Sequence, residues 1–475
     1  MSELALVLVA LVVGAAVVAA IRPSDAGEGA ESALRRLTAL ALGLALVATW
    51  TAASLLRPVL APGGSRATDV ACVLAVGVSV IVAWRSLRRR ARSVVGDDHV
   101  GPRNPKALVA ILCAALACAL ALVVARFLHR PDGEWDAISF WNLRARLLHR
   151  AGGDATVVFG SAVSGDHADY PLFVPGLVAA GWALVGEGAT WVTGVVALLF
   201  GGLAAAGVHT SVAARRGGVA AAIALLALVA YRAFLNSTSS RYVDVPLSAL
   251  LVLACGFVAA AYERPARARS AIALAGLSAS LAAWTKNEGA VHAIAVGLVF
   301  LARPPAGVRR VGVLASYLAG AAPFLAILLA FKLGLAPTND LVAGSSSASA
   351  WARLTDSSRY ATIARHLFDE LSRTTFGSFL LPATIALVVF GPRRRAGDAP
   401  VAAVLGLVAL AYAAVYVLTP QPLDWHLTWS LDRLLLHLYP SLLLAAALRV
   451  APPRVVAAPS EPGAAPSPAP SRSAP

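Results

Sequence analysis

Three acidic residues, Asp132, Glu134 and Asp136, follow an apolar run directly in the stretch HRPDGEWDAISFWNLRARLLHR. Carboxylates so close to hydrocarbon are costly. From Asp136 onward the spacing predicts an amphipathic helix that lies flat on a membrane surface. A carboxylate at the N-terminus of this helix suits a general base acting on a hydroxyl group, although helix capping by the three acids explains the same spacing. The polar arc of the helix is predicted to comprise Ser139, Asn142, Arg146, His149 and Arg150.

The next cluster is the stretch DHADYP, in which Asp166, His167 and Asp169 precede Pro171. Two acids and a histidine could bind a divalent cation, which is the one cofactor that the sequence suggests. The spacing is too loose to define a metal site, and a solvated turn ended by Pro171 accounts for these residues as well. We expect Asp169 to contribute to substrate binding and leave metal binding open.

Two further charged pairs lie where apolar runs begin or break. Arg241 and Asp244 stand in NSTSSRYVDVP at the start of one run, and Lys286 and Glu288 stand in WTKNE, which interrupts another. Ionisable groups this close to hydrocarbon are candidates for substrate binding. An N-cap role for Asp244, and snorkelling of Lys286 paired with Glu288, explain these residues almost as well.

A last cluster, DWHLTWSLDR, supplies His426, Asp432 and Arg433 as further candidates for substrate binding. Arg433 is expected at the membrane boundary, where its planar guanidinium suits a phosphate oxygen. The alternative is that Asp432 and Arg433 only mark the end of a helix. No single cluster is decisive, but all five are expected on one side of a membrane, which indicates an active site on that side.

Long apolar runs must position these residues. The chain has 475 residues, of which 58% are hydrophobic and 14% charged, and its mean hydropathy is +0.73. A soluble fold of this length needs more polar surface, so the composition predicts an all-α polytopic membrane protein with about thirteen transmembrane helices. The predicted spans are 3–21, 37–57, 68–84, 106–128, 189–213, 218–234, 245–262, 269–284, 289–302, 311–331, 377–390, 400–418 and 431–449.

The net charge of +15 is concentrated in short arginine runs between the predicted spans, so it indicates membrane topology rather than binding to nucleic acid. If these runs lie in the cytoplasm, the apolar segment 172–186 breaks the pattern unless it is re-entrant or interfacial, as we expect. The Pro, Ala and Ser tail 451–475 is expected to be disordered. The loops predicted on the opposite side are 129–171, 235–244, 285–288, 332–376 and 419–430.

The motifs WDA, DYPL, RYVDVPL, WTKNEG and SLDRLLL together resemble the polytopic GT-C glycosyltransferases, in particular bacterial relatives of the protein mannosyltransferases and the lipid A aminoarabinose transferases. The resemblance covers residues 106–450 as a catalytic module and leaves 1–105 as additional N-terminal helices with a basic loop. It implies inverting transfer of a sugar from a polyprenyl-phosphate donor to a lipid or glycan acceptor. The reaction is expected on the extracytoplasmic face of a bacterial plasma (inner) membrane.

The resemblance also implies roles for single residues. Asp136 matches the family's catalytic acid of the first outer loop, and Asp244 matches a second acid facing the same cavity. Asp169 stands near the place where relatives carry a Lys-Pro-Pro or similar motif, and this chain has no lysine there. The candidates for phosphate binding are therefore Arg241, Lys286 and Arg433.

Three alternative functions fit the same sequence. A transporter or lipid flippase needs charges deep within its spans, whereas the charges here gather at the ends of the spans. An O-antigen ligase or polymerase also acts outside the cytoplasm on lipid-linked sugars, and the sequence separates it poorly from a glycosyltransferase. A non-catalytic membrane scaffold is the third alternative.

Overall fold

Helices are the only regular structure in the part of the chain that the computed structural model describes, namely residues 29–60, 106–151, 154–159, 167–339, 346–373, 379–393 and 395–450. The prediction of an all-α fold is confirmed for these residues. The predicted spans 3–21 and 68–84 and the tail 451–475 lie outside them. The helices are α2 (Gly29–Leu60), α4 (Lys106–His129), η1 (Ala137–Asn142), α5 (Leu143–Arg150), α6 (Ala155–Phe159), α7 (Phe173–Val185), α8 (Trp191–Ala230), α9 (Arg232–Ser239), α10 (Asp244–Glu263), η2 (Pro265–Arg267), α11 (Ala268–Thr285), α12 (Asn287–Ala302), α13 (Arg310–Gly334), α15 (Ser347–Thr355), α16 (Ser357–Leu371), α17 (Leu380–Phe390), α18 (Asp398–Leu418) and α19 (Leu423–Arg449).

Seven of the described helices are long and apolar enough to cross a bilayer. Because a spanning helix closes its own backbone hydrogen bonds in hydrocarbon, this set makes the chain an integral membrane protein. The helices α7, α12 and α17 are apolar but shorter, and the predicted total of about thirteen spans is not confirmed. The seven candidates are Ala33–Ala52 within α2, together with α4, α8, α10, α13, α18 and α19.

Helix α8 covers most of the two predicted spans 189–213 and 218–234, and the chain reverses direction between them. Gly217 has φ 79° and ψ 176°, a backbone conformation open to glycine because it has no Cβ. Gly201, in the first half of α8, packs against Thr238, which follows the helix. A straight helix would hold these two residues about 50 Å apart at ~1.5 Å per residue, so the two halves of α8 lie side by side.

Helix α7 corresponds to the apolar segment 172–186. Its 13 residues extend about 20 Å, which is less than the ~30 Å of a hydrocarbon core. Most of its side chains are buried, and a Cβ at Gly176 would lie 2.6 Å from the carbonyl oxygen of Ala48 in α2. Helix α7 is therefore a short helix buried among longer ones, and whether this segment crosses the membrane stays a prediction.

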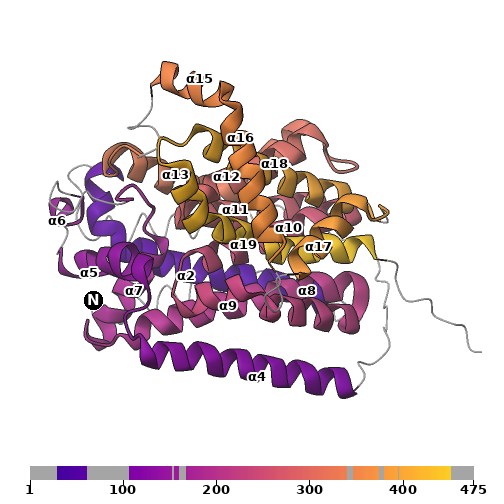
Figure 1. The fold of residues 1–475 in the computed structure, drawn as a ribbon, viewed down its shortest axis with the longest axis horizontal. Coiled ribbons are helices and arrows are strands. Elements are labelled where there is room, and N and C mark those ends of the chain that lie inside the picture. Colours follow the sequence, from indigo (N-terminus) through magenta and orange to yellow (C-terminus); the bar gives the residue numbers. More distant parts are fainter. Residues whose placement is uncertain are drawn as a thin grey trace, which may run out of the picture.

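Helix α10 lies at the centre of the bundle. It packs against α8, α11 and α19, and its most apolar stretch is 94% buried. Helix α4 is the opposite case, because it lies along the outer edge of the bundle in Figure 1 and its most apolar stretch is only 6% buried. Residues at the start of α10 are therefore held by protein on all sides, whereas most of the apolar surface of α4 is exposed.

Helices α11 and α13 approach each other through small residues. A Cβ at Gly320 would lie 1.8 Å from the carbonyl oxygen of Ala273, and one at Gly276 would lie 2.6 Å from that of Tyr317. Small residues let helix backbones meet in this way inside a membrane. The contact fixes the positions of the C-terminal ends of α11 and α13, both of which reach the candidate site.

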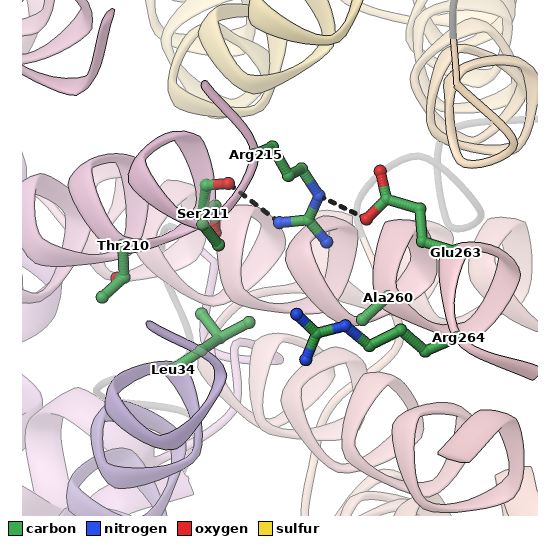
Figure 2. A pocket seen from close by; sticks show the side chains of 8 residues that line it. Leu34, Thr210, Ser211, Arg215, Ala260, Glu263 and Arg264 are labelled. Carbon is green, nitrogen blue, oxygen red and sulfur yellow. Dashed lines mark hydrogen bonds and ion pairs between the residues drawn. The ribbon is translucent and has the colours of Figure 1, made fainter. Parts of the chain in front are cut away.

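Arginines from distant parts of the chain gather at one end of the bundle, termed the basic end and defined by Arg215, Glu263 and Arg395. Arg215 pairs with Glu263 at 2.8 Å, and Arg395 lies 3.6 Å from the same carboxylate. Figure 2 shows Arg215 between the backbone of Ser211 and Glu263, beside a small cavity. Because Glu263 ends α10, Asp244 at its start lies at the opposite end, termed the site end. The compartment that each end faces stays a prediction.

The predicted loop 332–376 contains two helices that the apolar pattern alone did not indicate. Helix α15 begins with a capping box in which the side chains of Ser346 and Ser349 satisfy each other's backbone N–H groups. Helix α16 is capped by Asp356, the residue before its first, whose carboxylate accepts a hydrogen bond from the N–H of Ser358. In the sequence, these capping residues were the feature from which the starts of α15 and α16 could have been predicted.

Replacing Gly320 by alanine is expected to push α13 away from α11, because the added methyl group has no room beside Ala273. We expect a loss of about 1–3 kcal/mol in unfolding free energy. Gly406→Ala in α18 is the matched control, since no atom lies within 4 Å of a Cβ there. Thermal unfolding in detergent should show a lower midpoint for Gly320→Ala alone, and equal midpoints would contradict the close packing.

Candidate functional site

Asp244, the first residue of α10, is the centre of a charged cluster at the site end. Its side chain is 0% exposed. Its Oδ1 accepts hydrogen bonds from Lys286 at 3.0 Å and from His437 at 2.7 Å, and its Oδ2 lies 3.0 Å from Nε and 2.9 Å from Nη2 of Arg433. The helix N-terminus also favours a negative charge. Two cations and an imidazole thus offset the cost of burying this carboxylate.

Arg433 joins Asp244 to Asp136. Its Nη1 lies 2.7 Å from Oδ2 of Asp136, which remains 16% exposed, and its guanidinium lies 4.7 Å from the ring centroid of Tyr242. Burial and the nearby Asp136 carboxylate raise the pKa of Tyr242 to about 12, so this phenol keeps its proton at neutral pH. Of the two carboxylates that Arg433 holds, Asp136 is the one that a ligand can reach.

The break between α11 and α12 positions Lys286 and Glu288. Lys286 has an extended backbone, with φ −157° and ψ 155°, which ends one helix and precedes the next. Its Nζ lies 3.0 Å from Asp244 and 3.0 Å from Glu288. The break is tightly packed, because a Cβ at Gly289 would lie 1.9 Å from the carbonyl oxygen of Ala282. Lys286 therefore reaches Asp244 from a fixed backbone position.

Two tight turns tie the start of α10 to the segment after α4. Gly133 and Arg241 both have positive φ, at 88° and 61°. Nη1 of Arg241 donates a hydrogen bond to the carbonyl oxygen of Arg130 at 2.7 Å, and a Cβ at Gly133 would lie 2.7 Å from that of Ala137. Glycine is therefore required at this close approach, which holds Asp136 beside α10.

Behind Asp244, a chain of hydrogen bonds continues into the apolar bundle. Nδ1 of His437 lies 2.9 Å from the hydroxyl group of Tyr412, and that group lies 2.8 Å from Nε2 of His292. All three side chains are buried. Nδ1 of His292 ends the chain, since it has no hydrogen-bond partner among the described residues. Helices α12, α18 and α19 each contribute one member.

Asp169 belongs to a second network beside this cluster. Its carboxylate accepts hydrogen bonds from Lys332 at 2.9 Å, Asn287 at 2.7 Å and Asn339 at 2.9 Å. Burial alone would raise the pKa of the Asp169 carboxyl, but these bonds lower it below its ordinary value of 3.8. Because Asn287 follows Lys286 directly, the two networks share one backbone segment.

The divalent cation suggested for DHADYP gains no ligand set within the described ranges. Asp169 is bound by Lys332 and two amides, and the ring of His167 stacks on that of Tyr170 with centroids 4.7 Å apart. Asp166 lies outside the described residues. No group of three His, Cys, Asp or Glu side chains that the structure describes could hold a metal ion.

Five of the predicted binding residues lie outside the Asp244 cluster, namely Asp169 in the second network together with Glu134, Arg241, His426 and Asp432. Glu134 forms an ion pair with Arg130. Nδ1 of His426 lies 3.0 Å from the hydroxyl group of Thr419. Asp432 has no ion pair in the described part of the chain. The structure brings the other candidates to one end, and the catalytic and binding roles of all of them stay predictions.

Several polar residues at the site end were not identified from the sequence. A histidine within an apolar run is unusual, and that signal was present at His437 and His292. Lys332 near the end of an apolar run has the position of a snorkelling side chain. The set missed comprises Asn287, His292, Lys332, Tyr412 and His437.

The amphipathic helix predicted after Asp136 is present, but its predicted polar arc is wrong at Asn142. The π-helix η1 precedes α5, and α5 packs on α7. Asn142, placed on the polar arc, is buried and donates a hydrogen bond to the carbonyl oxygen of Asp132 at 2.8 Å. Arg146 and Arg150 both pair with Glu187. A π turn shifts the register of the following residues, which an ideal α-helical spacing does not anticipate.

Known proteins resemble this chain in structure more than in sequence. No protein-family model and no curated protein matches it. Its fold is similar to the crystal structure of ArnT from Cupriavidus metallidurans bound to undecaprenyl phosphate, with a TM-score of 0.49 and 17% sequence identity. The match covers 72% of this chain and 60% of the ArnT chain. A likeness at this level assigns no activity to this chain.

The hydrogen bonds to Asp169 make a prediction about acid stability. Because they lower the pKa of the carboxyl, their contribution to folding is complete above pH ~3.8 and is lost as the pH falls further. Asp169→Asn should therefore lower the unfolding midpoint at pH 7, and its difference from the wild type should shrink below pH ~3.8. Denaturation in detergent across this pH range measures the difference. A constant difference down to pH ~3 would contradict the assignment.

Proposed function

We propose that this protein transfers a sugar from a polyprenyl-phosphate donor to a hydroxyl group of a lipid or glycan acceptor, with Asp136 as the general base. The observation that carries the proposal is the position of Arg433, which bridges the accessible carboxylate of Asp136 and the buried carboxylate of Asp244. This arrangement holds a carboxylate and a guanidinium side by side at the end of a transmembrane bundle, which is what a base and a phosphate-binding cation acting together would require.

Asp136 suits the base because its carboxylate is 16% exposed and lies 2.7 Å from Nη1 of Arg433, beside the proposed phosphate site. Asp244 does not suit this role, since both of its oxygens are occupied and its side chain is 0% exposed. In the proposed reaction the acceptor hydroxyl group attacks the donor directly, and such a single displacement inverts the configuration of the sugar.

The two cations of the cluster retain donors for a phosphate group. A guanidinium carries five N–H groups, and Arg433 directs Nε, Nη1 and Nη2 each toward a carboxylate, so each Nη keeps a second N–H. Lys286 has three N–H groups and two carboxylate partners. These remaining donors can bind the phosphate oxygens and stabilise the charge that develops as the phosphate leaves.

A lipid-linked donor fits the position of this cluster. The cluster lies where α10 and α12 begin, at one end of an apolar bundle, so a phosphate bound there can keep its isoprenoid chain in the hydrocarbon. In a transport path, polar groups would continue toward the basic end. The chain behind Asp244 instead stops at His292 within the described residues.

Asp136→Asn is the direct test of the base, because it keeps the size of the side chain and removes its basicity. We expect transfer to fall about 10²- to 10⁴-fold, the range typical of a lost general base. In cells that lack the protein, the wild type should restore the envelope glycan and remove accumulated polyprenyl-phosphate sugar, as measured by mass spectrometry. Asp136→Asn should restore neither.

Asp356→Asn is the matched control, since Asp356 is an exposed cap of α16. It should behave as the wild type does. If removing the protein leaves both the glycans and the lipid-linked sugars unchanged, the proposed transfer is wrong. If Asp136→Asn restores both pools, the transfer stands but the base lies elsewhere.

A further inference from the structure

The buried chain from Asp244 to His292 has no role in the transfer step described above. Polar groups in an apolar bundle cost free energy unless each finds a partner. Here His437, Tyr412 and His292 partner one another, and the outermost of them binds the central carboxylate. Apolar side chains of similar volume would pack these helices together equally well. Packing therefore does not explain why three polar side chains stand here.

Each member of the chain can donate or accept a proton, so two arrangements satisfy the same contacts. With His437 neutral, its Nε2–H donates to Asp244, and its Nδ1 accepts from Tyr412, whose oxygen accepts from Nε2–H of His292. With His437 cationic, its Nδ1–H donates to Tyr412, whose hydroxyl group donates to Nε2 of His292, and His292 carries its proton on Nδ1. No heavy atom moves between them.

The second arrangement holds one proton more than the first. In the first arrangement His437, Tyr412 and His292 each carry one proton. In the second arrangement His437 carries two protons, and Tyr412 and His292 still carry one each. At the open end of the chain only Nδ1 of His292 changes its state, and this is the atom without a partner among the described residues. The chain can therefore store a proton without losing a hydrogen bond.

The charges around His437 determine whether its imidazole holds the additional proton. The three carboxylates of Asp136, Asp244 and Glu288 outnumber the two cations Lys286 and Arg433, which leaves a net charge of −1 while His437 is neutral. In the resting site the complete burial of the His437 ring, together with the two cations, opposes a charge on it. A bound phosphate group would draw on both cations and add negative charge, and both effects favour the imidazolium.

We propose that His437 takes up one proton from the solvent when the site binds a phosphate-bearing ligand, and that Tyr412 and His292 accommodate it by reversing their hydrogen bonds. The inference rests on the proposed function for the class of ligand. His437 is thus a positioning residue, which holds Asp244 through Nε2 in both states and adjusts the charge of the cluster to its occupant.

Proton uptake is measured by titration calorimetry at pH 7.5 in buffers of different ionisation enthalpy. The probe is citronellyl methyl phosphate, a prenyl phosphodiester whose single negative charge does not titrate near this pH, so any proton taken up belongs to the protein. We expect the full chain in detergent to bind it with uptake approaching one proton per ligand. His437→Gln should still bind the probe, since an amide can donate to Asp244, but without uptake.

Tyr412→Phe removes one oxygen atom and keeps the ring. A cationic His437 then loses the acceptor for its Nδ1–H, a charge-assisted bond that is stronger than the neutral bond it replaces. Uptake should therefore fall by at least half. Tyr439→Phe is the matched control in α19, because it removes a buried hydroxyl group that donates to the carbonyl oxygen of Ala227 and does not belong to the chain from Asp244 to His292. Its uptake should equal that of the wild type.

The outcomes separate the two proposals. Binding without uptake in the wild type, or uptake unchanged in both His437→Gln and Tyr412→Phe, overturns the inference and leaves the phosphate site intact. Failure of the wild type to bind the probe overturns the phosphate site, and the inference falls with it. If His437→Gln does not fold, Tyr412→Phe decides the matter through its difference from Tyr439→Phe.

Discussion

A fully buried carboxylate at the end of an apolar bundle is the constraint on which the rest of the site depends. Asp244 is ionised at no cost to folding only if cations reach both of its oxygens. Lys286 approaches from the break between α11 and α12, and Arg433 approaches from α19. The start of α10, the break between α11 and α12, and α19 must therefore all meet at the two carboxylate oxygens of Asp244. This requirement explains why the helix ends pack so tightly there.

Helix breaks deliver these side chains, and each break has a local cause. The extended backbone of Lys286 separates α11 from α12, and Gly289 admits the close approach that follows. The positive φ of Arg241 closes the turn before α10, opposite Gly133. A continuous helix would direct its polar side chains into lipid or into the packed core. Interrupting the helices at one level of the bundle brings polar groups together where the hydrocarbon ends.

The sequence predicted the helices well and the side-chain contacts between them poorly. Apolar runs predicted most of the described helices, and charged residues at their ends predicted that Asp136, Asp244, Lys286 and Arg433 would share one end of the bundle. It offered the local pair of Lys286 and Glu288, which the structure contains, but it did not predict which cations meet Asp244 and Asp136, because spacing along a helix describes a face and not a distance to a remote segment. The π turn after Asp136 was also invisible, since its effect is a shift of register within otherwise ordinary helix-forming residues.

The cluster is a poor means of stabilising a membrane bundle. Buried ion pairs roughly balance their own desolvation cost, and apolar residues of similar volume often hold a fold as well or better. This cluster is not even balanced, because three carboxylates face two cations. The imbalance is tolerable at a site that exchanges charge with a ligand or with solvent, and Asp136 at its edge is partly exposed to both. The excess negative charge of the cluster is therefore better explained by ligand binding than by packing of the helices.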